Sequence, residues 1–122
     1  MAKILVVDDD AVIQQLIEVN LELEGYEVDK ASNGQEALDK VAQDAPDLIL
    51  LDVMMPRMNG RDVCRLLKSD PKTASIPIIF LSARAQDMDV EAGLELGADA
   101  YVTKPFDPGQ LLDTISELLN KA

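Results

Sequence analysis

The sequence predicts a single α/β domain built around a parallel β-sheet. Short aliphatic runs alternate with segments of helical periodicity, which is the pattern of βαβ units. The 122 residues suffice for one domain that buries about two-thirds of the surface of its unfolded chain. The composition is 48% hydrophobic and 28% charged, and no apolar run approaches the roughly 20 residues of a membrane span. We therefore expect one domain over residues 1–122, in the cytoplasm and without membrane contact.

Five short apolar segments are the candidate strands of this sheet. The third and fourth have the character of strands buried on both faces, as in the middle of a parallel sheet. The second is the weakest and is expected at an edge. The candidate strands are residues 4–7, 27–31, 48–51, 76–81 and 100–102.

Apolar residues at helical spacing mark the helices between the strands. The last helix is the clearest, because its apolar residues follow the i, i+1, i+4, i+7, i+8 pattern of a helix packed on a sheet. Gly25 and Gly97 follow the first and fourth helices, where a left-handed cap costs glycine little. The positions expected to face the sheet are Ile13, Leu16, Ile17 and Leu21; Ala37, Leu38 and Val41; Val63, Leu66 and Leu67; and Leu111, Leu112, Ile115, Leu118 and Leu119.

Charge and residue usage exclude several classes of function. The net charge of -12 opposes binding to a phosphate backbone, and the 11 basic residues form no run, so no direct nucleic-acid contact is expected. The single Cys64 excludes an intrachain disulfide, and the absence of histidine excludes histidine general bases and histidine metal sites. The expected partners are proteins or a cation.

The third candidate strand raises a specific question, because its four aliphatic residues, 48–51, run directly into the carboxylate of Asp52. A buried carboxylate without partners is costly, so other groups must meet it. In an open parallel sheet, ligands bind beyond the carboxyl ends of the strands. Groups from the other strand ends therefore meet Asp52 at one edge of the sheet. They are Asp8, Asp9 and Asp10 after the first strand, Ser82 at the end of the fourth and Lys104 after the fifth.

This set of groups predicts a magnesium site with a nucleophile. Crowded carboxylates repel one another unless a cation relieves the field, and Mg²⁺ prefers hard oxygen ligands. Asp9 and Asp52 are the candidates for direct ligation, with Asp8 acting through water. Asp52 is also a candidate nucleophile for a phosphoryl group whose charge the metal and Lys104 neutralise, with Ser82 holding a further oxygen.

The segments ILVVDDD, LILLDVMMPRMNG, IIFLSA and GADAYVTKPF resemble the motifs of response-regulator receiver domains, the phosphoacceptor modules of two-component signalling. They occur in the order and at the spacing of that family, which includes the chemotaxis regulators, over essentially the whole chain. The resemblance implies a doubly wound, flavodoxin-like (βα)5 fold with five parallel strands in the order 2-1-3-4-5. This strand order comes from the family and is not worked out from the residues.

The resemblance also implies roles for individual residues. Asp52 is the implied phosphoacceptor, Lys104 the contact to the phosphoryl group, and Ser82 and Tyr101 the switch pair. The implied metal ligands are Asp8, Asp9, Asp52 and the backbone carbonyl of Met54. The implied phosphoryl donor is a sensor histidine kinase or a histidine phosphotransfer protein. The implied output is docking of a downstream effector protein on the surface of helix four, strand five and helix five, rather than catalysis on a separate substrate.

Simpler structural roles remain open for several of these residues. The run Asp8 to Asp10 is also typical of a helix N-cap, and we keep that role for Asp10. Lys104 on its own is compatible with a solvated surface lysine. Ser82 is also compatible with a cap of the next helix, and Tyr101 with a permanent core residue.

Two rival functions follow from the same residues. Asp8, Asp10 and Val12 spell D-x-D-x-V, which resembles the nucleophile motif of haloacid-dehalogenase-type phosphatases, with Asp8 attacked and Asp10 as acid/base. That reading leaves the motif around Asp52 unexplained. A flavin-binding domain fits the architecture, but an acidic first loop repels a flavin phosphate.

Two further expectations concern the lifetime of the phosphoryl group and self-association. Met54 and Arg84 are not obvious activators of water, so we expect slow self-dephosphorylation, with a half-life of the phosphorylated form longer than seconds. No basic residue lies between Arg84 and Lys104, so a monomer or weak dimer with an apolar docking face at Val90 and Ala92 is expected. Whether the domain acts alone or within a larger regulator stays open.

Overall fold

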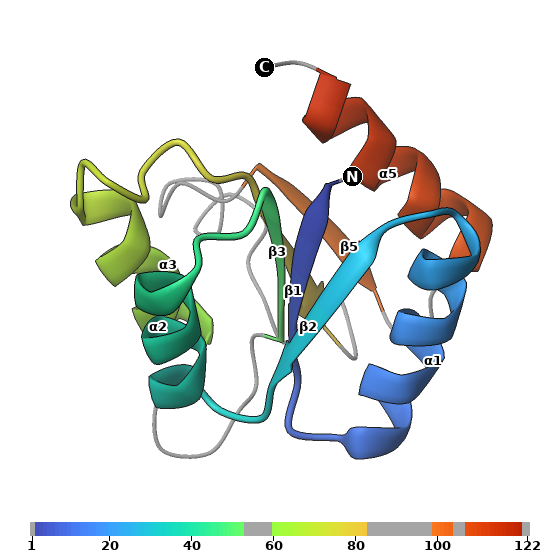
Figure 1. Ribbon diagram of the computed structural model, residues 1–122, viewed down its shortest axis with the longest axis horizontal. Helices are drawn as coiled ribbons and strands as arrows, with labels where there is room; N and C mark the ends of the chain where they lie inside the picture. Colours follow the sequence, from blue (N-terminus) through green and yellow to red (C-terminus); the bar gives the residue numbers. More distant parts are fainter. Residues whose placement is uncertain (1, 53–59, 83–98, 104–106, 121–122) are drawn as a thin grey trace.

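The computed structural model describes residues 2–52, 60–82, 99–103 and 107–120. Its five strands pair in parallel in the order β2-β1-β3-β4-β5, which confirms the expected fold (Figure 1). Gly97, Val90 and Ala92 lie outside the described residues, as does the expected fourth helix. The elements are β1 (Lys3–Val7), α1 (Ala11–Leu23), β2 (Glu27–Ala31), α2 (Gly34–Gln43), β3 (Leu48–Asp52), α3 (Gly60–Ser69), β4 (Ile78–Ser82), β5 (Ala100–Thr103) and α5 (Pro108–Asn120).

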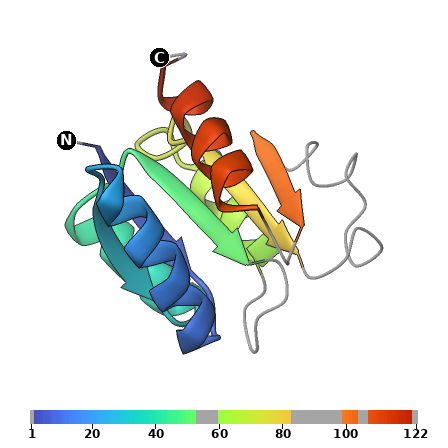
Figure 2. The same cartoon turned by 90° about the vertical axis from the view of Figure 1, so that its right-hand side faces the viewer.

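Side chains alternate along the strands between two apolar layers. In β1, Ile4 and Val6 pack with residues of α1 and α5, whereas Leu5 and Val7 pack with residues of α2 and α3. Figures 1 and 2 show these two helix pairs on opposite faces of the sheet. Helices therefore cover the sheet on both faces.

The central and edge strands differ in burial as expected. All five residues of β3 are buried, and Ile78, Ile79, Phe80 and Leu81 of β4 have no exposed surface. The edge strand β2 is exposed or half-buried except at Ala31. Within the described ranges, no helix is long and apolar enough to cross a membrane.

Three details of the sequence-based assignment were wrong. The fourth strand begins at Ile78 rather than at residue 76, because Pro77 has no N–H to donate to the ladder. Leu16 and Leu66, expected in the core, are each 48% exposed. On their helices the buried positions include Gln14 and Cys64 instead.

Helix α1 ends as its glycine predicts. Gly25 adopts φ 91, a left-handed conformation that costs glycine least. Its N–H donates to the carbonyl of Glu22 at 3.0 Å, and the N–H of Tyr26 donates to that of Leu21 at 3.1 Å, which together form a Schellman cap. The half-buried Tyr26 packs in the same apolar cluster as Leu21, so the cap also directs the chain into β2.

Candidate functional site

The carboxyl ends of β1 and β3 lie side by side, and an aspartate stands at each. The parallel register pairs Val7 with Leu51. The next residue along each strand is Asp8 or Asp52, so the two aspartates are neighbours. Asp8 has no exposed surface and Asp52 is 4% exposed. The strand-end rule thus identified a buried acidic pair.

A third carboxylate joins this pair. Oxygen atoms of Asp8, Asp9 and Asp52 lie within 4.8 Å of one another, with Asp9 on the exposed side. This distance is close to the roughly 4 Å between opposite ligands of an ion bound at 2.0–2.1 Å. Carboxylate oxygens of this number and spacing fit Mg²⁺, which completes its coordination with waters and phosphate oxygens.

Asp10, the last of the three consecutive aspartates, has a structural role. Its Oδ1 accepts hydrogen bonds from the N–H groups of Val12 at 2.9 Å and Ile13 at 3.4 Å, so Asp10 is the N-cap of α1. Its own N–H donates to Oδ1 of Asp8 at 2.9 Å. The N-cap role kept for Asp10 is confirmed. Its carboxylate binds the first turn of α1 and is not part of the group formed by Asp8, Asp9 and Asp52.

Gln14 belongs to the surroundings of the site and was not identified from the sequence. Its side chain is buried, and its Nε2 donates to the backbone carbonyls of Asp8 and Ala31. The available signal was its position three residues before Ile17 and seven before Leu21, on the buried face of α1. A polar residue on that face requires a hydrogen-bonding partner.

The two further candidates, Ser82 and Lys104, occur in the sequence at the end of β4 and directly after β5. Ser82 ends β4 and lies opposite Thr103 of β5, one position beyond the pairing of Asp52 with Leu81. Lys104 follows Thr103 directly, but Lys104 and Met54 lie outside the described residues, as does Arg84. Their predicted roles remain predictions.

Tyr101 lies on β5 opposite Phe80 and packs against the apolar layer of α2 and α3. The residue as a whole is half-buried, yet its hydroxyl oxygen is buried and has no hydrogen-bond partner among the described residues. The tip of the ring therefore points inward.

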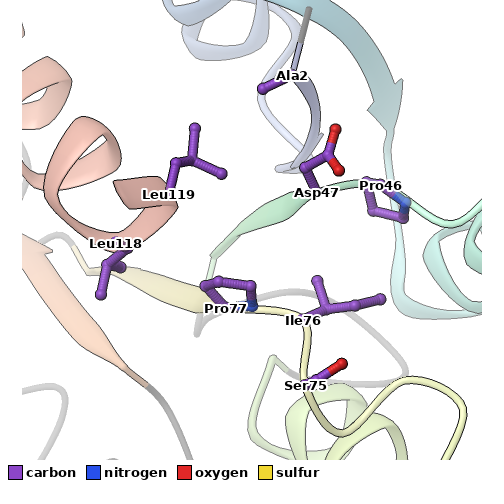
Figure 3. A pocket seen from close by; sticks show the side chains of 8 residues that line it. All are labelled: Ala2, Pro46, Asp47, Ser75, Ile76, Pro77, Leu118 and Leu119. Carbon is purple, nitrogen blue, oxygen red and sulfur yellow. The ribbon is translucent and has the colours of Figure 1, made fainter. Parts of the chain in front are cut away.

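Two other features lie away from the carboxylates. A hollow of about 500 Å³ at the amino ends of the strands is lined mainly by apolar residues from α5 and from the segments just before β1, β3 and β4, with Asp47 the one acid (Figure 3). The N–H of Lys3 donates to Asp47 at 2.7 Å, so this acid is already engaged. Burial raises the pKa of the Cys64 thiol, which favours its protonated form.

A family model described as the response regulator receiver domain matches residues 4–116. The chain belongs to this family. Among curated relatives, the receiver domain is 45% identical to the alkaline phosphatase synthesis transcriptional regulatory protein PhoP of Bacillus subtilis, over 98% of this chain and 49% of that protein. It is 42% identical to the DNA-binding dual master transcriptional regulator RpaA of Synechocystis, over 99% of this chain and 50% of that protein. The chain thus spans about half the length of these relatives.

Solved structures of the same kind match over nearly the whole receiver domain. The chemotaxis protein CheY4 of Vibrio cholerae has a TM-score of 0.91 and 35% identity, covering 97% of this chain and 98% of that one. The signal receiver domain of a histidine kinase from Syntrophus aciditrophicus has a TM-score of 0.93 and 36% identity, covering 100% of this chain and 92% of that one. A receiver domain from a chemotaxis protein and one from a histidine kinase therefore share this fold.

Proposed function

We propose that this receiver domain accepts a phosphoryl group on Asp52 from the phosphohistidine of a sensor histidine kinase or a histidine phosphotransfer protein. The observation that carries the proposal is the meeting of three carboxylates within 4.8 Å at the ends of β1 and β3. A carboxylate oxygen of Asp52 attacks phosphorus and forms a P–O bond while the P–N bond of the donor breaks. The electron pair of that bond stays on the imidazole nitrogen.

The surrounding groups neutralise charge during this transfer. The metal ligands are Asp8, Asp9, Asp52 and the backbone carbonyl of Met54. When bound, Mg²⁺ offsets the negative charge of the carboxylates and of the phosphoryl oxygens. Lys104 contacts one phosphoryl oxygen and Ser82 donates to another. The pairing of Ser82 with Thr103, the residue before Lys104, supports this division of roles.

The output is a change of surface rather than turnover of a separate substrate. Ser82 moves toward the phosphoryl group and Tyr101 responds, so that the surface of helix four, β5 and α5 docks a downstream effector protein. The net charge of -12 argues that this domain itself does not contact DNA, even though relatives such as RpaA are named DNA-binding regulators. Phosphorylation acts by stabilising one of two states more than the other.

We place the docking surface for the donor protein on α1, whose N-terminus follows the carboxylates of β1. Val12, Leu16, Val19 and Leu23 of α1 are 48–79% exposed. Their spacing of four, three and four residues places them in one stripe, which is the seam that packs against another helix. The stripe begins two residues after the N-cap Asp10. We therefore place the helices of the phosphohistidine donor on this stripe.

The direct test is to map the phosphoryl group after treatment with acetyl phosphate and Mg²⁺. We expect label on Asp52, no label in Asp52→Asn, and normal label in Asp113→Asn, which removes an exposed acid on α5. Label on Asp8 favours the phosphatase alternative. Normal labelling of Asp52→Asn contradicts the proposal.

A further inference from the structure

Gln14 stands out among the buried polar groups of the domain. Among the described residues, three polar or charged side chains are buried, and the other two, Asp8 and Asp52, are carboxylates of the site. Gln14 is 8% exposed and lies in the first turns of α1. Its Nε2 donates to the backbone carbonyl of Asp8 at 2.5 Å and to that of Ala31 at 2.8 Å. Both hydrogens of the amide nitrogen therefore have an acceptor.

We propose that Gln14 is a positioning residue that holds the Asp8–Asp9 pair in the orientation needed to bind Mg²⁺. The inference deepens the proposed function and rests on it. Gln14 touches neither the metal nor the phosphoryl group, because its contacts are with the backbone. It acts through the peptide from which both carboxylates extend.

The argument starts from the peptide that joins Asp8 to Asp9. The carbonyl of Asp8 belongs to this peptide, and peptides are planar. Fixing the direction of that carbonyl restricts ψ of Asp8 and φ of Asp9, the two backbone angles that lie between the side chains. One of these side chains is buried and the other is exposed, yet their oxygens come together. The hydrogen bond from Gln14 therefore favours the backbone conformation in which these oxygens meet.

The second acceptor anchors the same amide to the sheet. Ala31 is the last residue of β2, and its carbonyl accepts the N–H of Asp8 at 3.1 Å as well as the amide of Gln14. Gln14 therefore connects α1, the end of β2 and the turn after β1. The remaining freedom of the turn is limited by the bond from the N–H of Asp10 to Oδ1 of Asp8.

Stability alone does not explain an amide at this position. Ile17 and Leu21 occupy the same buried face, and a methionine at position 14 also fills the space without burying an amide. Removing the amide takes a donor from the carbonyls of Asp8 and Ala31 and so lowers stability, but ordering a glutamine side chain also costs entropy. The amide does supply a directional constraint that an apolar residue does not.

The experiment compares Gln14→Met with Gln15→Met. Gln15 is the adjacent glutamine and is exposed, so its replacement controls for the chemistry of the substitution. The magnesium dissociation constant is measured on the unphosphorylated protein by titrating Mg²⁺ alone and following backbone amide shifts. The rate of labelling by acetyl phosphate is then measured at increasing Mg²⁺. Thermal unfolding without metal gives the stability of each variant.

We expect Gln14→Met to weaken magnesium binding about tenfold, the lower end of effects from groups that orient metal ligands. Labelling at saturating Mg²⁺ should remain within about twofold of wild type, since the nucleophile is unchanged, and Gln15→Met should match wild type throughout. If Gln14→Met does not fold, Gln14→Asn takes its place. The shorter amide reaches the carbonyls less well, so we expect an intermediate loss of affinity.

Two negative results are distinguishable. Unchanged magnesium affinity in a folded Gln14 variant, even with a lower melting temperature, overturns the positioning role and leaves a structural one. Wild-type protein that neither binds Mg²⁺ nor takes label on Asp52 overturns the proposed function itself, whatever the Gln14 variants do.

Discussion

The two ends of the sheet treat their acidic residues in opposite ways. At the amino end, Asp44 and Asp99 each pair with a lysine, and Asp47 accepts a backbone N–H. At the carboxyl end, three carboxylates are gathered within 4.8 Å. Charges separated and paired with described cations stabilise the fold, whereas charges of one sign held close together create a field that favours binding of a cation. We therefore expect substitutions at the amino end to change mainly stability and substitutions at the carboxyl end to change mainly metal binding.

The largest expected effect on stability is at the amino end. The Nζ of Lys68 donates to the carbonyls of Ala74 at 3.1 Å and Ile76 at 2.8 Å and to Asp99 at 3.2 Å, with the side chain 17% exposed. Lys68→Met should lower the free energy of unfolding by about 2–3 kcal/mol, because partly buried acceptors lose a charged donor. Urea unfolding measures the loss. Labelling of Asp52 should be unchanged. A large loss of labelling would contradict the claim that the amino end contributes to stability and not to phosphorylation.

Removing a carboxylate at the carboxyl end of the sheet should have the opposite effect and raise the free energy of unfolding. Asp9→Asn relieves repulsion, so we expect a gain of a few tenths of a kcal/mol in stability without metal, since the group is exposed. Magnesium binding should weaken about tenfold or more, because a ligand is lost. Asp47→Asn, at the amino end, is the matched control and should leave magnesium affinity unchanged. Equal effects of the two substitutions on metal binding contradict the comparison.

The apolar stripe of α1 offers a kinetic test. Leu16 and Leu66 are each 48% exposed but lie on α1 and α3 respectively, on opposite faces of the sheet. Leu16→Gln should slow phosphoryl transfer from a phosphohistidine donor about fivefold, a loss of about 1 kcal/mol for an exposed apolar contact. Leu66→Gln should not slow it. Both variants should react normally with acetyl phosphate. Equal rates with the protein donor contradict docking on α1.

The smallest effect concerns Tyr101. Removing its buried hydroxyl removes a polar group without a described partner, so Tyr101→Phe should leave stability unchanged or raise it by up to about 1 kcal/mol. Thermal unfolding measures this. A fall in stability of more than about 1 kcal/mol shows that the hydroxyl has a partner in the unphosphorylated protein.

The sequence was a good guide to features that depend on one strand or on strand ends. Alternating segments predicted the parallel sheet, and the rule for strand ends grouped Asp8, Asp9 and Asp52 before any coordinates. The strand order itself came from the family resemblance. The N-cap at Asp10 followed from local chemistry, because capping depends on only a few neighbouring residues.

Features that depend on how a helix packs against the sheet were harder to predict from the sequence. Helix α1 is apolar around much of its circumference, so periodicity alone did not show that Leu16 is exposed or that Gln14 is buried. The partners of Gln14 lie at the ends of two different strands, one of them 17 residues away. Such contacts depend on tertiary packing, which no local pattern records.

The central claim is that the gathered carboxylates bind a divalent ion so that Asp52 can carry a phosphoryl group. The most direct measurement is heteronuclear NMR with Mg²⁺ and beryllofluoride, a stable mimic of the aspartyl phosphate. We predict that both reagents together shift the amides of Asp8, Asp9 and Asp52, with coupled changes at Ser82 and Tyr101, and that Asp52→Asn abolishes the response. An unchanged spectrum, or the same response in Asp52→Asn, contradicts the account.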